Sequence, residues 1–165
     1  MSQDTNVNAS TEEQSNDDDS WEQRELPYID DCPLLGFLQL CADRRFHSLI
    51  QNEFQKDAGL KESTDYWIHA DAGGTPKMEH LTIAPDYCYN DKKVWLMGWA
   101  AHGAGCGGFG EHVKDQVIRK ALKETVERQQ RRYRDARHFC YFVTIKKEGN
   151  TEETVVYSMT GKGSN

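Results

Sequence analysis

The sequence predicts an α/β protein with a small, mainly parallel sheet flanked by helices and with C-terminal β segments. Three observations predict this class. Almost wholly apolar runs lie at residues 34–42 and 94–101, as in strands that are buried on both faces of a parallel sheet. Stretches with helical spacing alternate with the predicted strands. Two further β-like runs, separated by a turn, close the chain.

The acidity of the chain is confined to its first 25 residues. This stretch holds eight acidic residues and one basic residue, which accounts for the whole net charge of −7, and residues 26–165 are balanced. A segment of this composition buries too little apolar surface to fold. We therefore expect an acidic disordered tail over residues 1–25 and one folded domain over residues 26–165. A second interpretation is that the tail docks on a basic partner.

The first half of the domain reads as strand, helix and strand. The run at 34–42 is the first strand, and Phe46, Ile50 and Phe54 follow at helical spacing until Gly59 stops the helix. Residues 66–70 form the second strand, which ends in a turn at residues 71–76. A short helix is expected over residues 78–83 within the connection that follows.

The second half begins with the clearest strand, at residues 94–101. A glycine-rich loop over residues 102–110 leads to a long helix over residues 111–134, whose apolar positions form one stripe. The basic run at residues 128–137 suits the negative end of a helix dipole, so we do not expect nucleic-acid binding. Residues 138–145 and 154–159 are predicted to form a hairpin.

Composition also bears on the compartment. No apolar stretch approaches the roughly 20 residues that span a bilayer, so no membrane partner is expected. The chain has five cysteines and no recognisable secretory signal. An odd number of thiols in such a chain favours reduced cysteines and a cytoplasmic location.

Two cysteine-bearing segments follow the first and third predicted strands. Cys41-Ala-Asp43-Arg-Arg45 ends the first apolar run, and His102-Gly-Ala-Gly-Cys106 ends the other. Ligand sites in open α/β sheets lie beyond the carboxyl ends of the strands, so we expect both segments at one edge. Two thiolates and an imidazole are a donor set that zinc prefers. The predicted zinc ligands are Cys41, His102 and Cys106, with His69 as the alternative histidine.

An acid and a base lie next to the first thiol. Asp43 is placed to ligate the metal at rest or to accept a hydrogen bond from zinc-bound hydroxide. Arg45 is placed to hold Asp43 by a charge-assisted pair and so to leave one metal position open for water. The adjoining glycines allow the backbone to approach a small substrate closely.

These residues resemble the β-class carbonic anhydrases. The similarity covers roughly residues 34–161 and consists of Cys-x-Asp-x-Arg after a buried strand, an Ala-Gly-Gly loop after the next strand, and a histidine and Cys-Gly-Gly before a helix. The resemblance implies that Cys41, His102 and Cys106 bind Zn²⁺, with Asp43 and Arg45 as a catalytic dyad. It also implies a homodimer or higher homo-oligomer. The spacing departs from the family, which has His-x-x-Cys where this chain has three residues between His102 and Cys106.

The leading functional hypothesis is a carbonic-anhydrase-like zinc lyase that hydrates carbon dioxide to bicarbonate through a zinc-bound hydroxide. One alternative on the same fold is hydrolysis of carbonyl sulfide or carbon disulfide. Another is a non-catalytic binding or assembly module, which the altered spacing and short chain motivate. A phosphate-binding loop over residues 103–110 ranks last, because the segment fits no Walker or dinucleotide pattern.

Overall fold

The computed structural model of the chain describes residues 33–80 and 83–162. Within them lies a five-stranded sheet of order β2-β1-β3-β4-β5. Neighbours among the first four strands run parallel, and β5 runs antiparallel to β4. The strands are β1 (Gly36–Cys41), β2 (Tyr66–Asp71), β3 (Leu96–His102), β4 (Arg137–Glu148) and β5 (Thr151–Lys162). The predicted α/β class with a mainly parallel sheet is thus confirmed. The predicted tail, residues 1–25, lies outside the described residues.

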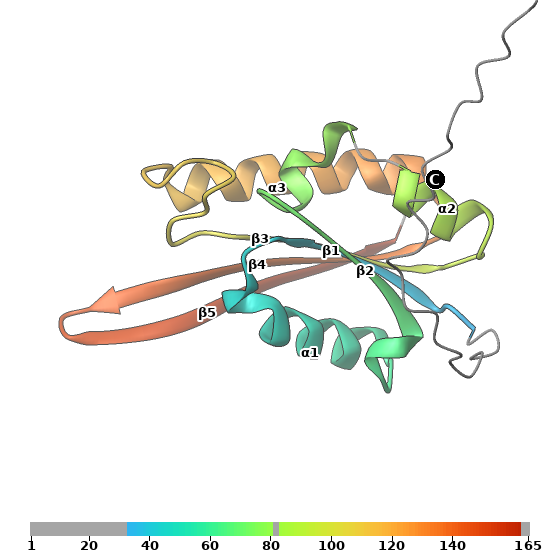
Figure 1. Cartoon of the computed structure of the whole chain (residues 1–165), viewed down its shortest axis with the longest axis horizontal. Helices are drawn as coiled ribbons and strands as arrows, with labels where there is room; N and C mark the ends of the chain where they lie inside the picture. The colour runs from blue at the N-terminus through green and yellow to red at the C-terminus, as the bar shows by residue number, and fades with distance from the viewer. Residues whose placement is uncertain (1–32, 81–82, 163–165) are drawn as a thin grey trace, which may run out of the picture. The chain divides into compact units, whose positions relative to one another are not determined.

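Helices cover both faces of the sheet. Helix α1 lies on one face, and α2 and α3 lie on the other (Figure 1). Their bounds are α1 (His47–Ala58), α2 (Ile83–Asn90) and α3 (Asp115–Arg132), with short 3-10 helices η2 (Arg44–Phe46), η3 (Ser63–Asp65) and η4 (Thr75–His80). Gly59 ends α1 in the left-handed conformation (φ 71°), as its position in the sequence predicts.

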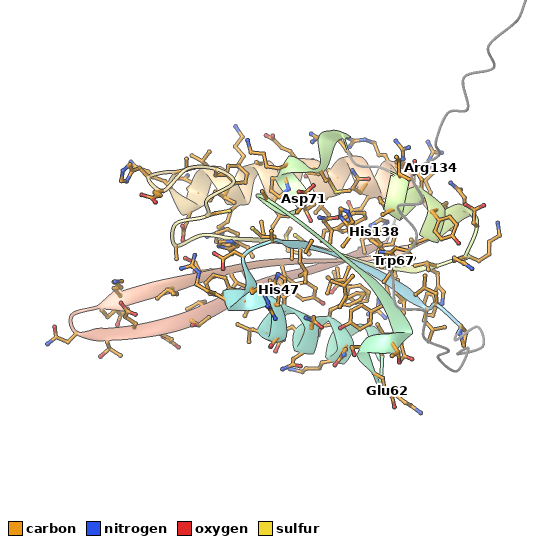
Figure 2. The ribbon with its side chains drawn as sticks, viewed as in Figure 1. His47, Glu62, Trp67, Asp71, Arg134 and His138 are labelled. Atoms are coloured by element: carbon orange, nitrogen blue, oxygen red, sulfur yellow. The ribbon has the colours of Figure 1, made fainter. Side chains whose placement is uncertain are left out.

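Alternate strand residues supply two separate hydrophobic cores. In β1, Phe37 packs into the α3-side core and Leu38 into the α1-side core. The same alternation continues in β4, where Phe139 lies on the α1 side and Phe142 on the α3 side. Side chains accordingly fill the space on both faces of the sheet (Figure 2). This two-sided burial explains why the central strands read as continuous apolar runs.

The α1-side core is centred on Phe54, which is fully buried. Its ring meets those of Tyr66 and Phe139 edge-on, with centroids 5.2 and 5.6 Å away. Gly98 makes room for it, because a Cβ at this position would lie 3.0 Å from the ring and 2.6 Å from Leu38 Cδ1. One aromatic side chain of α1 thereby packs across the middle of the sheet.

The α3-side core contains a buried polar contact between β3 and β4. Trp99 Nε1 donates to His138 Nδ1 over 2.9 Å, and His138 Nε2 lies 2.9 Å from the carbonyl oxygen of Tyr133. The Trp99 N–H needs an acceptor, so Nδ1 carries no proton. The Tyr133 carbonyl only accepts, so the proton of the neutral ring is on Nε2. Burial also lowers the pKa of His138. Figure 2 shows His138 between the sheet and the helices.

Two predicted helices differ in extent from the observed ones. The helix expected over residues 78–83 is wrong in its bounds: η4 ends at residue 80 and α2 begins at Ile83. Pro85 is tolerated there because the first-turn amides of a helix have no intrahelical acceptor. The long helix begins at Asp115 instead of residue 111, since Lys114 is still extended.

The hairpin strands are also longer than predicted, at 12 residues each. The prediction ended them at the last apolar residue. Pairing continues through charged residues such as Lys147 and Glu152, which also form an ion pair of 2.6 Å. Among the described residues, no helix combines the length and apolar character that crossing a bilayer requires.

Candidate metal centre

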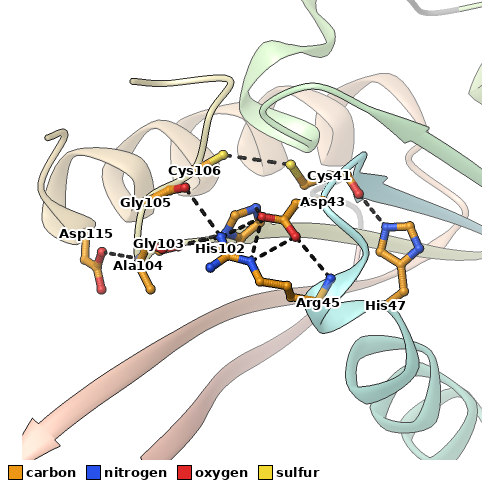
Figure 3. Close-up of polar contacts among 10 residues, drawn as sticks. All are labelled: Cys41, Asp43, Arg45, His47, His102, Gly103, Ala104, Gly105, Cys106 and Asp115. Carbon is orange, nitrogen blue, oxygen red and sulfur yellow. Dashed lines mark hydrogen bonds and ion pairs between the residues drawn. The ribbon is translucent and has the colours of Figure 1, made fainter. Parts of the chain in front are cut away.

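The three predicted zinc ligands meet at the carboxyl edge of the sheet. Cys41 is the last residue of β1, His102 is the last residue of the adjacent β3, and Cys106 lies in the loop that follows (Figure 3). One donor atom from each lies within 4.8 Å of the others, and all three residues are buried. The prediction that the two cysteine segments meet is confirmed.

The separation of the two sulfur atoms suits zinc. Cys41 Sγ and Cys106 Sγ lie 3.8 Å apart. Two thiolates at about 2.3 Å from one tetrahedral ion would be separated by about 3.8 Å. The group could therefore hold a metal ion, and its donor types match those zinc prefers.

Of the two ring nitrogens of His102, one is hydrogen-bonded to the backbone and the other faces the two thiols. Its Nδ1 lies 2.8 Å from the carbonyl oxygen of Gly103, so Nδ1 carries the proton of the neutral ring and donates it there. The lone pair then lies on Nε2. This atom is buried and has no hydrogen-bond partner among the described residues, and Asp43 Oδ2 lies 3.6 Å away. A buried acceptor without a donor is what a metal ion would satisfy.

The loop between His102 and Cys106 is turned sharply by its backbone. Ala104 and Gly105 both have positive φ angles, of 50° and 81°. Two successive left-handed residues turn the loop sharply, and Gly105 does so in open space. The spacing of three intervening residues therefore still returns the Cys106 thiol to the histidine.

Asp43 and Arg45 form a close pair beside the triad. Arg45 Nη2 donates to Asp43 Oδ2 over 2.6 Å, and Nε donates to both carboxylate oxygens over 3.0 and 2.9 Å. The backbone N–H of Arg45 adds a fourth bond of 3.1 Å, because Asp43 caps η2. These bonds from Arg45 lower the pKa of Asp43 to about 2, although its partial burial opposes them. Asp43 is therefore ionised at neutral pH.

The cluster shifts the pKa values of its own members. Burial raises the pKa of Cys41, but the adjacent His102 and the backbone amides of Asp43 and Gly73 outweigh it and bring the pKa to about 7. Burial and the neighbouring Cys41 raise the pKa of Cys106. Burial disfavours a charged His102, yet Cys41, the Gly103 carbonyl and Asp43 together raise its pKa. The Cys41 thiol therefore ionises first, and the Cys106 thiol would lose its proton on metal binding.

The Ala-Gly-Gly loop after β2 closes one side of the site. A Cβ on Gly74 would lie 2.6 Å from the carbonyl oxygen of Ala100 and 3.2 Å from the backbone nitrogen of Cys41. A Cβ on Gly108 would lie 2.2 Å from the backbone nitrogen of Gly73. The three loops predicted to gather at this edge are in backbone contact, which only glycine permits.

The other candidates lie outside the triad. His69 Nδ1 contacts Gln39 Oε1 over 2.9 Å on β1 and β2, and Asp71 caps its own turn by accepting from the Ala72 amide over 2.9 Å. Cys88 and Cys140 are buried in the α3-side core, and burial raises their pKa values to about 11 and about 12. Cys32 lies outside the described residues.

Three residues at the site had not been predicted from the sequence to lie there. His47 Nε2 donates to the Cys41 carbonyl over 2.6 Å, and the buried Phe46 ring lies 5.0 Å from the His102 ring. Asp115 contacts the loop between His102 and Cys106. An acidic residue suits the first turn of a helix, so the sequence does favour Asp115 at a helix start. It was missed because the helix was predicted to begin at residue 111.

Comparison with known proteins gives no family assignment. No model of a known protein family matches the chain. No significant match among curated proteins is found either. Inference about function therefore depends on the geometry of the site.

Proposed function

We propose that the chain is a zinc-dependent lyase that reversibly hydrates carbon dioxide to bicarbonate, on a fold of the β-class carbonic anhydrase type. One observation carries the proposal. Two thiols and an unpartnered imidazole nitrogen converge within 4.8 Å at the edge of a parallel sheet, next to an ionised carboxylate held by an arginine.

Cys41, His102 and Cys106 would hold the ion. Bound zinc supplies a Lewis acid that lowers the pKa of water toward about 7. His102 is oriented for this role by the bond from its Nδ1 to Gly103, which directs Nε2 toward the thiols.

Asp43 acts as a hydrogen-bond acceptor next to the reacting groups. Its pKa of about 2 makes it a weak base but a permanent anion near neutral pH. Arg45 donates to both carboxylate oxygens of Asp43 and so restrains this side chain from turning toward the three metal-ligand atoms. One carboxylate oxygen lies 3.6 Å from His102 Nε2, close enough to orient a small hydroxylic reactant.

The surroundings of the triad suit a small apolar substrate. Phe46 packs against His102, and the loop glycines bring backbone within contact distance without adding side-chain bulk. An apolar wall with few polar groups is typical of small-molecule sites.

Elemental analysis of the protein purified without chelator tests the metal. We expect about one zinc per chain in the wild type and a loss of most of it in Cys41→Ser and Cys106→Ser. Cys140→Ala is the matched control, because it removes a buried thiol of the same core without touching the triad. A wild-type protein free of zinc after growth in zinc-supplemented medium contradicts the proposal.

Stopped-flow hydration of carbon dioxide, followed with a pH indicator, tests the reaction. The zinc-loaded wild type should show hydration, and Asp43→Ala should reduce it while zinc content is retained. Sulfide release from carbonyl sulfide is measured in parallel. Zinc binding without either reaction would leave a metal-binding module and refute the lyase.

A further inference from the structure

The loop that carries Cys106 is tied to two neighbouring elements by one carboxylate. Asp115, the first residue of α3, accepts from the backbone N–H of Ala104 over 3.2 Å through Oδ1. Its other oxygen, Oδ2, accepts from the hydroxyl of Thr144 on β4. Asp115 thereby links the loop, the sheet and the helix, as Figure 3 shows for its bond to Ala104.

The Ala104 amide belongs to the same peptide unit as the carbonyl that orients His102. The Gly103 carbonyl and the Ala104 N–H lie on one planar peptide, so they move as a rigid body. The carbonyl accepts from His102 Nδ1 over 2.8 Å, and the N–H donates to Asp115 Oδ1. Rotating the peptide away from Asp115 would also rotate the acceptor away from the imidazole.

The Asp115 carboxylate lies where a Cβ on residue 103 would be placed. A Cβ on Gly103 would lie 2.1 Å from Asp115 Oδ1 and 2.3 Å from its carboxyl carbon. Gly103 itself is held to the sheet by a bond of 2.8 Å from its N–H to the Val143 carbonyl. The carboxylate occupies the space that any side chain here would need.

We infer that Asp115 is a positioning residue for His102, acting through the 103–104 peptide, and this inference rests on the proposed metal function. A carboxylate bonded directly to a metal-ligating histidine fixes the tautomer and direction of the ring. In this chain a single peptide lies between the carboxylate and the imidazole. Asp115 keeps the proton on Nδ1 and the lone pair of Nε2 aimed at the thiols.

Cobalt titration of the metal-free protein tests the inference. Co²⁺ is the probe, because thiolate and imidazole ligation give it characteristic visible absorption. We expect Asp115→Ala to bind Co²⁺ roughly tenfold to a hundredfold more weakly and with altered bands. Asp115→Asn should lose less, since its amide oxygen can still accept from Ala104. Asp57→Ala is the control, because Asp57 also accepts from a β4 hydroxyl, that of Tyr141, but on α1.

A double-mutant cycle adds a second test. Gly103→Ala should weaken cobalt binding strongly in the wild type, because the new methyl collides with the carboxylate. In the Asp115→Ala background the same change should cost little, since the collision is gone. If the losses of cobalt affinity in the two single variants simply add in the double variant, the inference is overturned. If circular dichroism shows that Asp115→Ala does not fold, cobalt binding by Asp115→Asn and Thr144→Val is compared with that of the wild type instead.

The tautomer of His102, read by long-range ¹H–¹⁵N spectra of the metal-free protein, separates this inference from the proposed function. The wild type should show the Nδ1–H form, and Asp115→Ala should show a mixture. An unchanged tautomer together with cobalt affinity within twofold of wild type overturns the role of Asp115 while leaving metal binding intact. A wild type that binds no cobalt refutes the metal function, and the tautomer still decides for or against Asp115.

Discussion

Replacing Gly74 by alanine tests how closely the loop after β2 packs against the candidate metal centre. Gly74 has a φ of 63°, and an added Cβ would meet the Ala100 carbonyl at 2.6 Å and the Cys41 backbone at 3.2 Å. Gly59 provides the matched comparison. Its φ is 71°, but a Cβ there meets nothing within 4 Å.

Both substitutions place an alanine in the left-handed conformation, but only Gly74→Ala also creates a steric overlap. Alanine in the left-handed conformation costs about 1–2 kcal/mol at either position. Only Gly74→Ala adds an overlap with backbone atoms that cannot turn away, for which overpacking costs of about 1–3 kcal/mol are typical. We therefore expect Gly59→Ala to destabilise the protein by about 1–2 kcal/mol and Gly74→Ala by about 2–5 kcal/mol.

Urea unfolding followed by circular dichroism measures both values, and the unfolding midpoint temperature should fall by about 4 °C per kcal/mol for a domain of this size. Gly74→Ala should also weaken metal binding, because the displaced loop adjoins Cys41, whereas Gly59→Ala should not. Equal losses of stability in the two variants would refute the packing argument.

Three further predictions concern the cores. Trp99→Phe leaves His138 Nδ1 buried without its donor, so it should lower the free energy of unfolding by about 1–3 kcal/mol, measured in urea. Phe54→Ala should cost about 3–5 kcal/mol in the same assay, because Gly98 beneath it cannot fill the cavity. Stability should fall as pH rises above about 9, since Cys88 and Cys140 keep their protons in the folded chain up to pKa values of about 11 and 12, and the unfolded chain loses them sooner. Urea titrations from pH 7 to 10 on the wild type and the double alanine variant of these cysteines check this, and an equal slope in both would contradict it.

The central strands were predictable because burial on both faces leaves a strong sequence signal. Cys41 and His102 could be placed at one edge because parallel strands end there together. The hairpin was underestimated because its outer half pairs through charged residues, for which hydrophobicity gives no signal. The helix between β2 and β3 was predicted over residues 78–83, before Pro85, but α2 runs through Pro85 because a helix tolerates proline in its first turn.

The details of the site depended on geometry that local patterns do not encode. The loop between His102 and Cys106 is turned by positive φ angles at Ala104 and Gly105, and an alanine gives no warning of a positive φ. The role inferred for Asp115 requires the contact of its carboxylate with a loop 11 residues earlier in the chain. The homodimer stays a prediction.

The position of the triad between the two cores has a consequence for how the domain unfolds. Cys41 and Cys106 belong to the α3-side core, whereas His102 packs against Phe46 of the α1-side core. A sheet separates two such layers, and each could loosen by itself as a local opening unit. An ion held by all three side chains would cross-link them at a point where the two cysteines are 65 positions apart. Metal loading would then merge two openings into one cooperative event, and amide exchange in α1 and α3 would slow together.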